Sequence, residues 1–313
     1  MEKKITIMIP VYNEQESLKI LYDRLKNILK QIDYNYEILF INDGSNDNSI
    51  DIIKSLRKED SGVSYVNLSR NYGKEVAMAA GFDYAKGDAL IIMDADLQDP
   101  PELIPEMIKY WEEGYDDVYA KRRSRKGESW LKKKTSLWYY RVLKTVSKTP
   151  IQEDTGDFRL VSRRAVEALK RYKEVHRYTK GYFSLIGFKK KEVLFDRDPR
   201  IAGKTKWNYF KLIDLAIEGI TSFTAFPLKI STYIGFTVAF FSFVYLLWVI
   251  LKTLMFGESV AGYPSLISVI LFMGGIQLIC IGIIGEYLSR VFSETKNRPL
   301  YFIDDYNGEK WNG

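Results

Sequence analysis

Two long apolar runs near the C-terminal end constrain the fold of this 313-residue chain more than any other feature. The first, at about residues 228–251, carries Lys229 as its one charged residue, and the second, at about 266–284, has Gln277 as its one strongly polar residue. A helix needs about 20 residues to cross a hydrocarbon core roughly 30 Å thick. We therefore predict transmembrane helices over residues 228–252 and 265–286, with a buried hairpin of a globular protein as the alternative.

Basic residues flank the two runs on their outer sides, whereas the short connection between them offers only Lys252 and Glu258. The positive-inside rule places the basic flanks in the cytoplasm. We expect a multi-pass protein of the plasma (inner) membrane, with the domain at 1–226 and the tail at 287–313 both cytoplasmic. The flanking residues are Lys204, Lys206, Lys211 and Lys229 before the runs and Arg290, Lys296 and Arg298 after them.

Glycines in the second run favour close packing of helices and predict a homo-oligomer, with a tetramer as one candidate. They are Gly274, Gly275, Gly282 and Gly285.

Composition excludes several classes of function. The net charge of +6 is too small to indicate a nucleic-acid partner. One cysteine, Cys280, excludes an intramolecular disulfide, and one histidine, His176, excludes a histidine-cluster metal site. Basic and aromatic residues instead gather at 125–148 and 204–226, which predicts interfacial segments against the lipid bilayer, with ordinary surface helices as the alternative.

The first hundred residues alternate short apolar β-type runs with amphipathic helices, and each apolar run ends in polar side chains. This pattern predicts an α/β fold with a doubly wound, mostly parallel sheet, whose ligand crevice lies at the carboxyl ends of the strands. The dinucleotide fingerprint GxGxxG and the P-loop GxxxxGK[ST] are both missing from the expected places. The side chains expected to converge are Asn13, Glu14, Asp43, Arg70, Lys74, Asp94 and Asp96.

Asp94 and Asp96 follow the apolar run Ile91–Met93 and lie two residues apart, so an extended strand end directs both to one side. Two carboxylates this close repel each other unless a cation lies between them, and hard oxygen ligands suit Mg²⁺ or Mn²⁺. The natural ligand is then a metal-bridged diphosphate, with a base or ribose near Asp43. A solvated strand-to-loop turn is the alternative.

Four sequence blocks at the predicted strand ends resemble those of a known family. They are Pro10-Val11-Tyr12-Asn13-Glu14, Asn42-Asp43-Gly44-Ser45, Ser69-Arg70-Asn71-Tyr72-Gly73-Lys74 and Asp94-Ala95-Asp96-Leu97-Gln98-Asp99-Pro100-Pro101-Glu102. With Asp157-Phe158-Arg159-Leu160 and the two apolar runs, the whole chain resembles the polyisoprenyl-phosphate glycosyltransferases of glycosyltransferase family 2. These include bactoprenol glucosyltransferases and dolichol-phosphate mannose synthases. One departure is Asn42, where many relatives have Asp; this leaves Asp43 for the nucleoside.

The resemblance implies a GT-A type domain over residues 1–226 that moves a hexose from a nucleotide-diphosphate sugar to the phosphate of a membrane polyprenol, with inversion at the anomeric carbon. It implies that Asp94, Asp96 and Gln98 hold Mg²⁺ or Mn²⁺ at the diphosphate. The residues implied at the base and ribose are Pro10, Tyr12, Glu14 and Asp43, with Arg70 and Lys74 near the nucleotide. The implied catalytic residues are Asp96, at the metal, and Asp157, which faces the acceptor.

A phosphate acceptor is already ionised near neutral pH, so Asp157 can orient substrates instead of acting as a base. Positive side chains must hold the lipid phosphate next to an anionic donor, and the residues expected to do so are Arg122, Arg125, Arg200 and Lys204.

Several functions remain open from sequence. Glucose from UDP-glucose, transferred to undecaprenyl phosphate, is the first choice. Mannose from GDP-mannose, or N-acetylhexosamine, galactose or aminoarabinose from UDP, would use the same motifs. A processive polysaccharide synthase is disfavoured because the chain lacks QxxRW and has only two expected spans. A non-catalytic membrane scaffold would leave the acidic residues unexplained.

Overall fold

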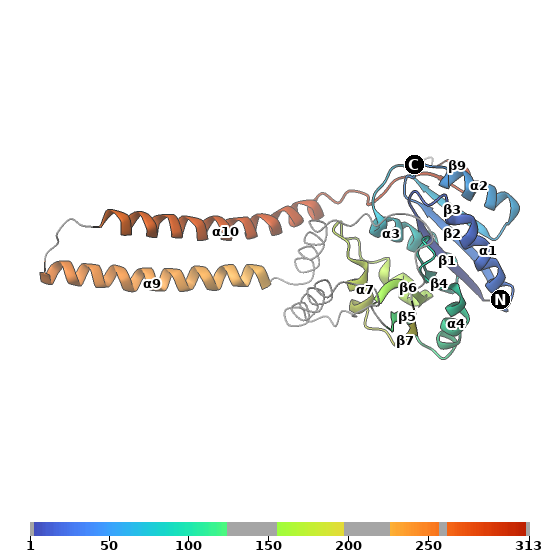
Figure 1. Ribbon diagram of the computed structural model, residues 1–313, viewed down its shortest axis with the longest axis horizontal. Helices are drawn as coiled ribbons and strands as arrows, with labels where there is room; N and C mark the ends of the chain where they lie inside the picture. The colour runs from blue at the N-terminus through green and yellow to red at the C-terminus, as the bar shows by residue number, and fades with distance from the viewer. Residues whose placement is uncertain (1–2, 124–154, 197–225, 257–261, 311–313) are drawn as a thin grey trace. The chain divides into compact units, whose positions relative to one another are not determined.

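The computed structural model describes residues 3–123, 155–196, 226–256 and 262–310 (Figure 1). The interfacial segments expected at 125–148 and 204–226 lie almost wholly outside these ranges, as do Arg125, Arg200 and Lys204. The chain divides into two compact units, residues 1–213 with 299–313, and residues 214–298.

The first unit contains a nine-stranded sheet among its described residues. Its strands are β1 (Lys4–Val11), β2 (Asn35–Asn42), β3 (Val63–Leu68), β4 (Ala89–Ile92), β5 (Asp117–Arg122), β6 (Thr155–Ser162), β7 (Lys190–Phe195), β8 (Ile303–Tyr306) and β9 (Glu309–Lys310). The helices of this unit are α1 (Leu18–Leu29), α2 (Ser49–Glu59), α3 (Lys74–Tyr84), the short 3₁₀ helix η1 (Pro101–Leu103), α4 (Ile104–Glu112), α6 (Arg163–Leu169) and α7 (Thr179–Leu185).

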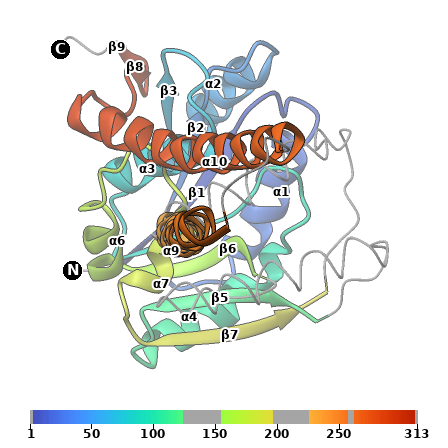
Figure 2. The same cartoon turned by 90° about the vertical axis from the view of Figure 1, so that its left-hand side faces the viewer.

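The strand order is β7-β5-β6-β4-β1-β2-β3-β8-β9. Strands β4, β1, β2 and β3 are mutually parallel, as expected, whereas β6 pairs antiparallel with both β4 and β5, which makes the sheet mixed. Strand β7 lies beside β5 and parallel to it at the edge (Figure 2). The chain adds β2 and β3 on one side of β1 and then returns to place β4 on the other. That reversal creates a topological switch point between β1 and β4, where open α/β sheets bind ligands.

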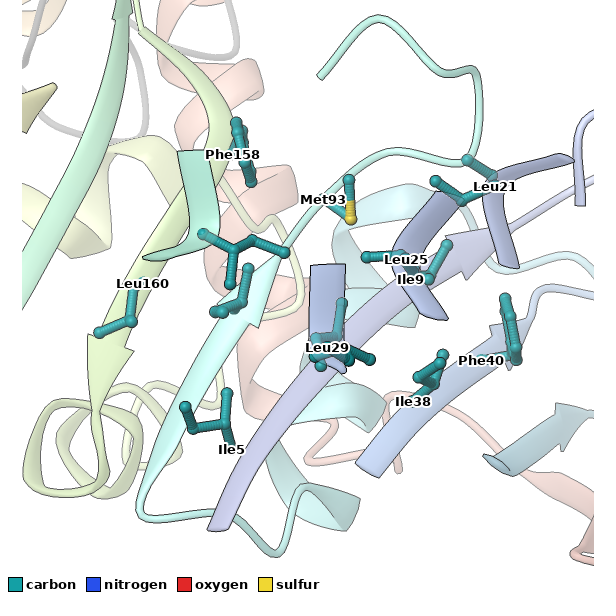
Figure 3. Packing of buried hydrophobic residues seen from close by; sticks show 14 of the residues in the cluster. Ile5, Ile9, Leu21, Leu25, Leu29, Ile38, Phe40, Met93, Phe158 and Leu160 are labelled. Atoms are coloured by element: carbon teal, nitrogen blue, oxygen red, sulfur yellow. The ribbon is translucent and has the colours of Figure 1, made fainter. Parts of the chain in front are cut away.

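The main core lies between one face of the sheet and helices α1, α2 and α4. Helix α1 buries Leu18, Leu21, Leu25 and Leu29, whose spacing puts them on one helical face. Figure 3 shows the last three of these leucines in the core. These leucines meet the alternate residues of β1, including Ile5 and Ile9, because successive strand side chains point to opposite faces. Burial of each such side chain contributes about 1.5–3 kcal/mol. The other face is covered by α3, whose small residues allow close approach to β1 and β2.

Part of the segment at 287–313, which was predicted as a cytoplasmic tail, returns to the sheet. Helix α10 continues to Thr295, and residues after 299 belong to the first unit, where β8 pairs antiparallel with β3. The segment Ile303-Asp304-Asp305-Tyr306 is short and polar, so its strand character arises from pairing with a distant strand.

The second unit is a hairpin of α9 (Phe226–Phe256) and α10 (Tyr263–Thr295), which lie side by side (Figure 1). Each contains a stretch long and apolar enough to cross a membrane, at Phe226–Tyr245 and Phe272–Thr295. Only 6% and 0% of these stretches is buried within the protein, unlike the core helix of a globular protein. The two expected spans fall inside these helices, and their crossing of a membrane stays a prediction.

Asp117 on β5 and Arg159 on β6 form an ion pair in which both side chains are 0% exposed. Both carboxylate oxygens of Asp117 accept from Nη1 of Arg159 at 3.2 Å, and the guanidinium lies 3.7 Å from the ring centre of Phe183. Removing one partner of such a pair leaves a buried charge without compensation.

We predict that Asp117→Asn lowers the free energy of unfolding by about 3–5 kcal/mol, because the Arg159 guanidinium stays buried without its counter-charge. Thermal unfolding of the full chain in detergent measures this loss. Glu167→Gln is the matched control, since its pair with Arg163 is exposed and should contribute less than about 0.5 kcal/mol. Equal losses in the two variants would contradict the prediction.

Candidate active site

The loops that follow β1 and β2 are joined by reciprocal hydrogen bonds. The backbone N of Asn13 donates to Ser45 Oγ at 3.0 Å, and the backbone N of Asn46 donates to Asn13 Oδ1 at 2.8 Å. The backbone N of Glu14 donates to Ser49 Oγ at 2.9 Å. Asn13 adopts a φ of 56°, which asparagine tolerates better than most residues. These bonds fix the loop that carries Tyr12 and Glu14, directly after Pro10 in β1.

Asp43 lies at the end of β2 and is only 3% exposed. Its Oδ1 accepts from the backbone N of Tyr72 at 2.7 Å, and its Oδ2 accepts from that of Gly73 at 2.9 Å. Burial raises the pKa of the Asp43 carboxyl, and the two backbone donors partly offset this rise. Asp43 therefore holds the loop at residues 69–73. The sequence predicted only a contact with the nucleoside for this residue.

Gly44 allows that same loop to approach. Its φ is 62°, and a Cβ at this position would overlap the backbone of Arg70 and Asn71. In the loop, the Arg70 guanidinium lies 4.2 Å from the ring centre of Tyr72, within the range of a cation–π interaction.

Lys74, the first residue of α3, forms ion pairs with residues of two other segments. Its Nζ lies 2.6 Å from Asp94 Oδ1, after β4, and 2.5 Å from Asp157 Oδ2, on β6. Although burial acts to lower it, the pKa of Lys74 is held well above its ordinary value by the Asp157 and Asp94 carboxylates. The structure thus brings together three predicted site residues from three separate elements.

In the loop after β4, acidic side chains accept hydrogen bonds from the loop's own backbone. The backbone N of Gln98 donates to Asp96 Oδ1 at 3.1 Å, and the backbone N of Asp94 donates to Asp99 Oδ2 at 3.2 Å. Leu97 is fully buried and has a φ of 61°, an unfavourable conformation that is typical of functional loops. Burial, together with the charges of Asp94 and Asp96, raises the pKa of Asp99 to about 7.

Within the described ranges, no three His, Cys, Asp or Glu side chains are grouped as metal ligands. The predicted set of Asp94, Asp96 and Gln98 contains two carboxylates and one amide, which are hard oxygen donors of the kind that Mg²⁺ and Mn²⁺ prefer. Asp99 adds a third carboxylate to this loop, and its Oδ2 accepts from the backbone N of Asp94. The residues present therefore fit a divalent cation.

Asp157 faces Lys74 with one oxygen, whereas its Oδ1 is buried and accepts no hydrogen bond from any residue that the structure describes. Burial acts to raise its pKa, but the charges of Lys74, Lys180 and Arg159 and the Lys74 hydrogen bond hold the pKa of Asp157 well below its ordinary value. Asp157 is therefore a weak proton acceptor, and one of its oxygens lacks a hydrogen-bond partner among the described residues.

Sequence reasoning missed three residues at this site: Glu75, Asp99 and Lys180. Glu75 Oε2 accepts from the backbone N of Thr179 at 2.8 Å, which ties the start of α7, and hence Lys180, to α3. Asp99 could have been identified as a third acidic residue of the block at 94–102, whereas nothing in the sequence around Lys180 indicates a place at the site. Of the residues expected at the lipid phosphate, only Arg122, the last residue of β5, is described.

We predict that Gly44→Ala destabilises the fold more than Gly114→Ala. Both glycines have positive φ, which costs an alanine about 1 kcal/mol, but only at Gly44 would the Cβ also overlap backbone. The expected difference is at least about 1 kcal/mol in thermal unfolding of the full chain. Equal destabilisation would show that the loop at 69–73 can move away from Gly44 at no cost.

Two family models match this chain. Glycosyl transferase family 2 matches residues 6–170, which include most of β1, all of β2 to β6 and the acidic loop. The GtrB C-terminal hairpin matches residues 226–291, the region of α9 and most of α10.

Named relatives match over nearly the full length. The chain is 48% identical to a prophage bactoprenol glucosyl transferase homolog of Escherichia coli, over 96% of this chain and 98% of that protein. It is 47% identical to the bactoprenol glucosyl transferase of Shigella phage SfII, over 96% and 97%.

Among solved structures, mannosyl-3-phosphoglycerate synthase from Rubrobacter xylanophilus matches with a TM-score of 0.50 and 15% identity, over 69% of this chain and 71% of that one. This likeness concerns the fold alone. It agrees with the GT-A type glycosyltransferase fold expected from the sequence. The extent of the family-2 match and of the relatives shows that this chain is a glycosyltransferase and belongs to glycosyltransferase family 2.

Proposed function

We propose that this enzyme transfers glucose from UDP-glucose to undecaprenyl phosphate or a similar polyprenyl phosphate, at the cytoplasmic face of a membrane. The observation that carries the proposal is the identity of 47–48% to bactoprenol glucosyl transferases over 96% of the chain. The product would be a lipid-linked sugar that serves as a donor for cell-envelope glycosylation.

The reaction joins two anions, and the site contains the charges that such a reaction needs. A phosphate oxygen of the lipid attacks the anomeric carbon while the bond from that carbon to the diphosphate oxygen breaks, with inversion at the carbon and release of UDP. Asp94, Asp96 and Gln98 would hold Mg²⁺ or Mn²⁺, which as a Lewis acid stabilises the charge of the leaving diphosphate. The Lys74 ammonium adds a positive charge near the diphosphate, because it already lies between Asp94 and Asp157.

Asp157 orients the substrates in this scheme and does not remove a proton. Its lowered pKa makes it a poor base, and an ionised phosphate has no proton that must be removed. Its Oδ1 has no hydrogen-bond partner among the described residues, and we expect it to accept one from a hydroxyl of the bound donor sugar, which would hold the anomeric carbon in line with the attacking oxygen.

The remaining parts of the proposal concern the lipid. Arg122, Arg125, Arg200 and Lys204 would hold the lipid phosphate, and segments 125–148 and 204–226 would lie at the membrane surface. Helices α9 and α10 would cross the membrane, with both termini in the cytoplasm. The exposed apolar surfaces of these helices support this arrangement, and the glycines of α10 support a homo-oligomer, with a tetramer as the candidate.

A donor screen tests the function directly. Membranes that contain the full chain are given undecaprenyl phosphate and one radiolabelled sugar nucleotide at a time. The expected result is labelled lipid from UDP-glucose in the presence of Mg²⁺ or Mn²⁺. Preferential labelling from GDP-mannose or another UDP-sugar would show that this sugar nucleotide, and not UDP-glucose, is the donor. The absence of labelled lipid with every sugar nucleotide would overturn the proposed function.

We predict that Asp96→Asn abolishes transfer and leaves thermal unfolding unchanged, because the substitution removes a ligand charge from a loop that packing already holds. Asp23→Asn, on the exposed face of α1, is the control and should transfer as the unaltered enzyme does. Full activity of Asp96→Asn over a titration of Mn²⁺ would refute the metal assignment.

We predict that Asp157→Asn lowers kcat about 100-fold, as expected for lost alignment of reacting groups. Because the pKa of Asp157 lies below its ordinary value of about 3.9, the residue stays ionised at neutral pH. The rate of the unaltered enzyme should therefore lack an acidic limb from Asp157 between about pH 6 and 8. A limb in that range that disappears in Asp157→Asn would identify Asp157 as a base instead.

A further inference from the structure

The C-terminal strap, defined here as residues 301–307, does more than cover the edge of the sheet. Its strand β8 pairs with β3 from Val66↔Tyr306 to Leu68↔Ile303. Beyond β8, the backbone N of Tyr65 donates to Asn307 Oδ1 at 2.8 Å, and the backbone N of Asn307 donates to Tyr65 O at 3.1 Å. These bonds satisfy the edge of β3, which would otherwise present unpaired backbone groups.

At its other end the strap continues past β3 and binds the loop at residues 69–73. The backbone N of Ser69 donates to Phe302 O at 3.0 Å, and the backbone N of Phe302 donates to the Tyr72 hydroxyl at 3.2 Å. The same hydroxyl lies 3.0 Å from Ser69 Oγ. Covering β3 does not require these contacts, because residues 69–73 lie beyond the end of that strand.

The strap also binds α3, the helix that follows this loop. The Tyr301 hydroxyl donates to Asp83 Oδ2 at 2.8 Å. Asp83 lies near the end of the helix that starts at Lys74. Consecutive strap residues thus bind the loop that carries Arg70 and the helix that carries Lys74.

The loop is therefore held from two directions. Asp43 binds the backbone of Tyr72 and Gly73 from β2, and the strap binds the Tyr72 hydroxyl from the C-terminal end of the chain. The Tyr72 ring lies against Arg70, and the next residue after Gly73 is Lys74, which bridges Asp94 and Asp157. A shift of the strap would change the position of both basic residues.

We propose that the C-terminal strap is a positioning element of the donor site, and that Tyr72 and the backbone of Phe302 set the affinity for the nucleotide by fixing the loop at 69–73. The inference rests on the proposed function, in which Arg70 and Lys74 lie near the nucleotide. Tyr72 acts through its neighbours, so it is a positioning residue and not a catalytic one.

The test uses Tyr72→Phe in the full chain, solubilised in detergent. This variant keeps the ring beside Arg70 and removes only the hydroxyl that meets the strap. Tyr301→Phe removes the strap's bond to α3, and Tyr22→Phe is the matched control, since its hydroxyl donates to Asp60 at 3.0 Å away from the strap. Calorimetry with UDP and Mg²⁺ measures Kd, and hydrogen exchange measures the protection of the Tyr72 and Gly73 amides.

We expect Tyr72→Phe to bind UDP about two- to tenfold more weakly, the usual effect of one lost hydrogen bond, and Tyr301→Phe to change Kd in the same direction. The Tyr72 and Gly73 amides should exchange faster in both variants. The KM for the nucleotide sugar should rise while kcat and the KM for the lipid change less than twofold. Tyr22→Phe should leave all of these values unchanged.

Unaltered UDP affinity and unaltered exchange in Tyr72→Phe would overturn the inference, as would an equal effect of Tyr22→Phe. A failure of the proposed function would look different, because the unaltered enzyme would then bind UDP without forming glucosylated lipid. The binding and exchange measurements require no transfer, so they decide the role of the strap in either case.

Discussion

The contact of one ammonium group with two carboxylates organises the carboxyl edge of this sheet. Lys74 Nζ lies within 2.6 Å of Asp94 and 2.5 Å of Asp157, which belong to segments about 60 residues apart in the chain. The ion pairs compensate charges that would otherwise repel, and they keep Asp157 ionised. The position of Lys74 depends on the loop before it, which Asp43, Gly44 and the C-terminal strap hold in place.

The strand order explains why these groups meet. Because β2 and β3 extend from one side of β1 and β4 from the other, the loops after β1 and β4 face each other across the switch point. The antiparallel strand β6 then lies next to β4 and brings Asp157 beside Asp94. The residues proposed for the donor and for the acceptor therefore lie next to each other in one sheet.

Much of this arrangement could be predicted. The four parallel strands, their helices and the polar residues at their ends follow from local periodicity, and the acidic block at 94–102 was a candidate site before any contact was known. The match to glycosyltransferase family 2 confirms the family that these blocks resemble. The direction of β6 could not be predicted, and neither could the burial of Arg159 against Asp117 or the approach of Lys180 to Asp157. These features depend on pairing between distant segments, which leaves no periodic signal in either one.

The sequence by itself determined the class of this protein, because strand and helix periods, acidic strand ends and two apolar runs are properties of contiguous residues. It also identified the residues that have the right chemistry. Only the tertiary structure decided which of them form ion pairs, that Asp43 holds a loop, and that residues 301–307 return to the sheet. Those outcomes depend on burial and on distances between segments far apart in the chain. Positive charges from distant segments hold the pKa of Asp157 low against the effect of burial, and hydrogen bonds from Asp43 and Phe302 hold Tyr72; neither effect can be read from neighbouring residues alone.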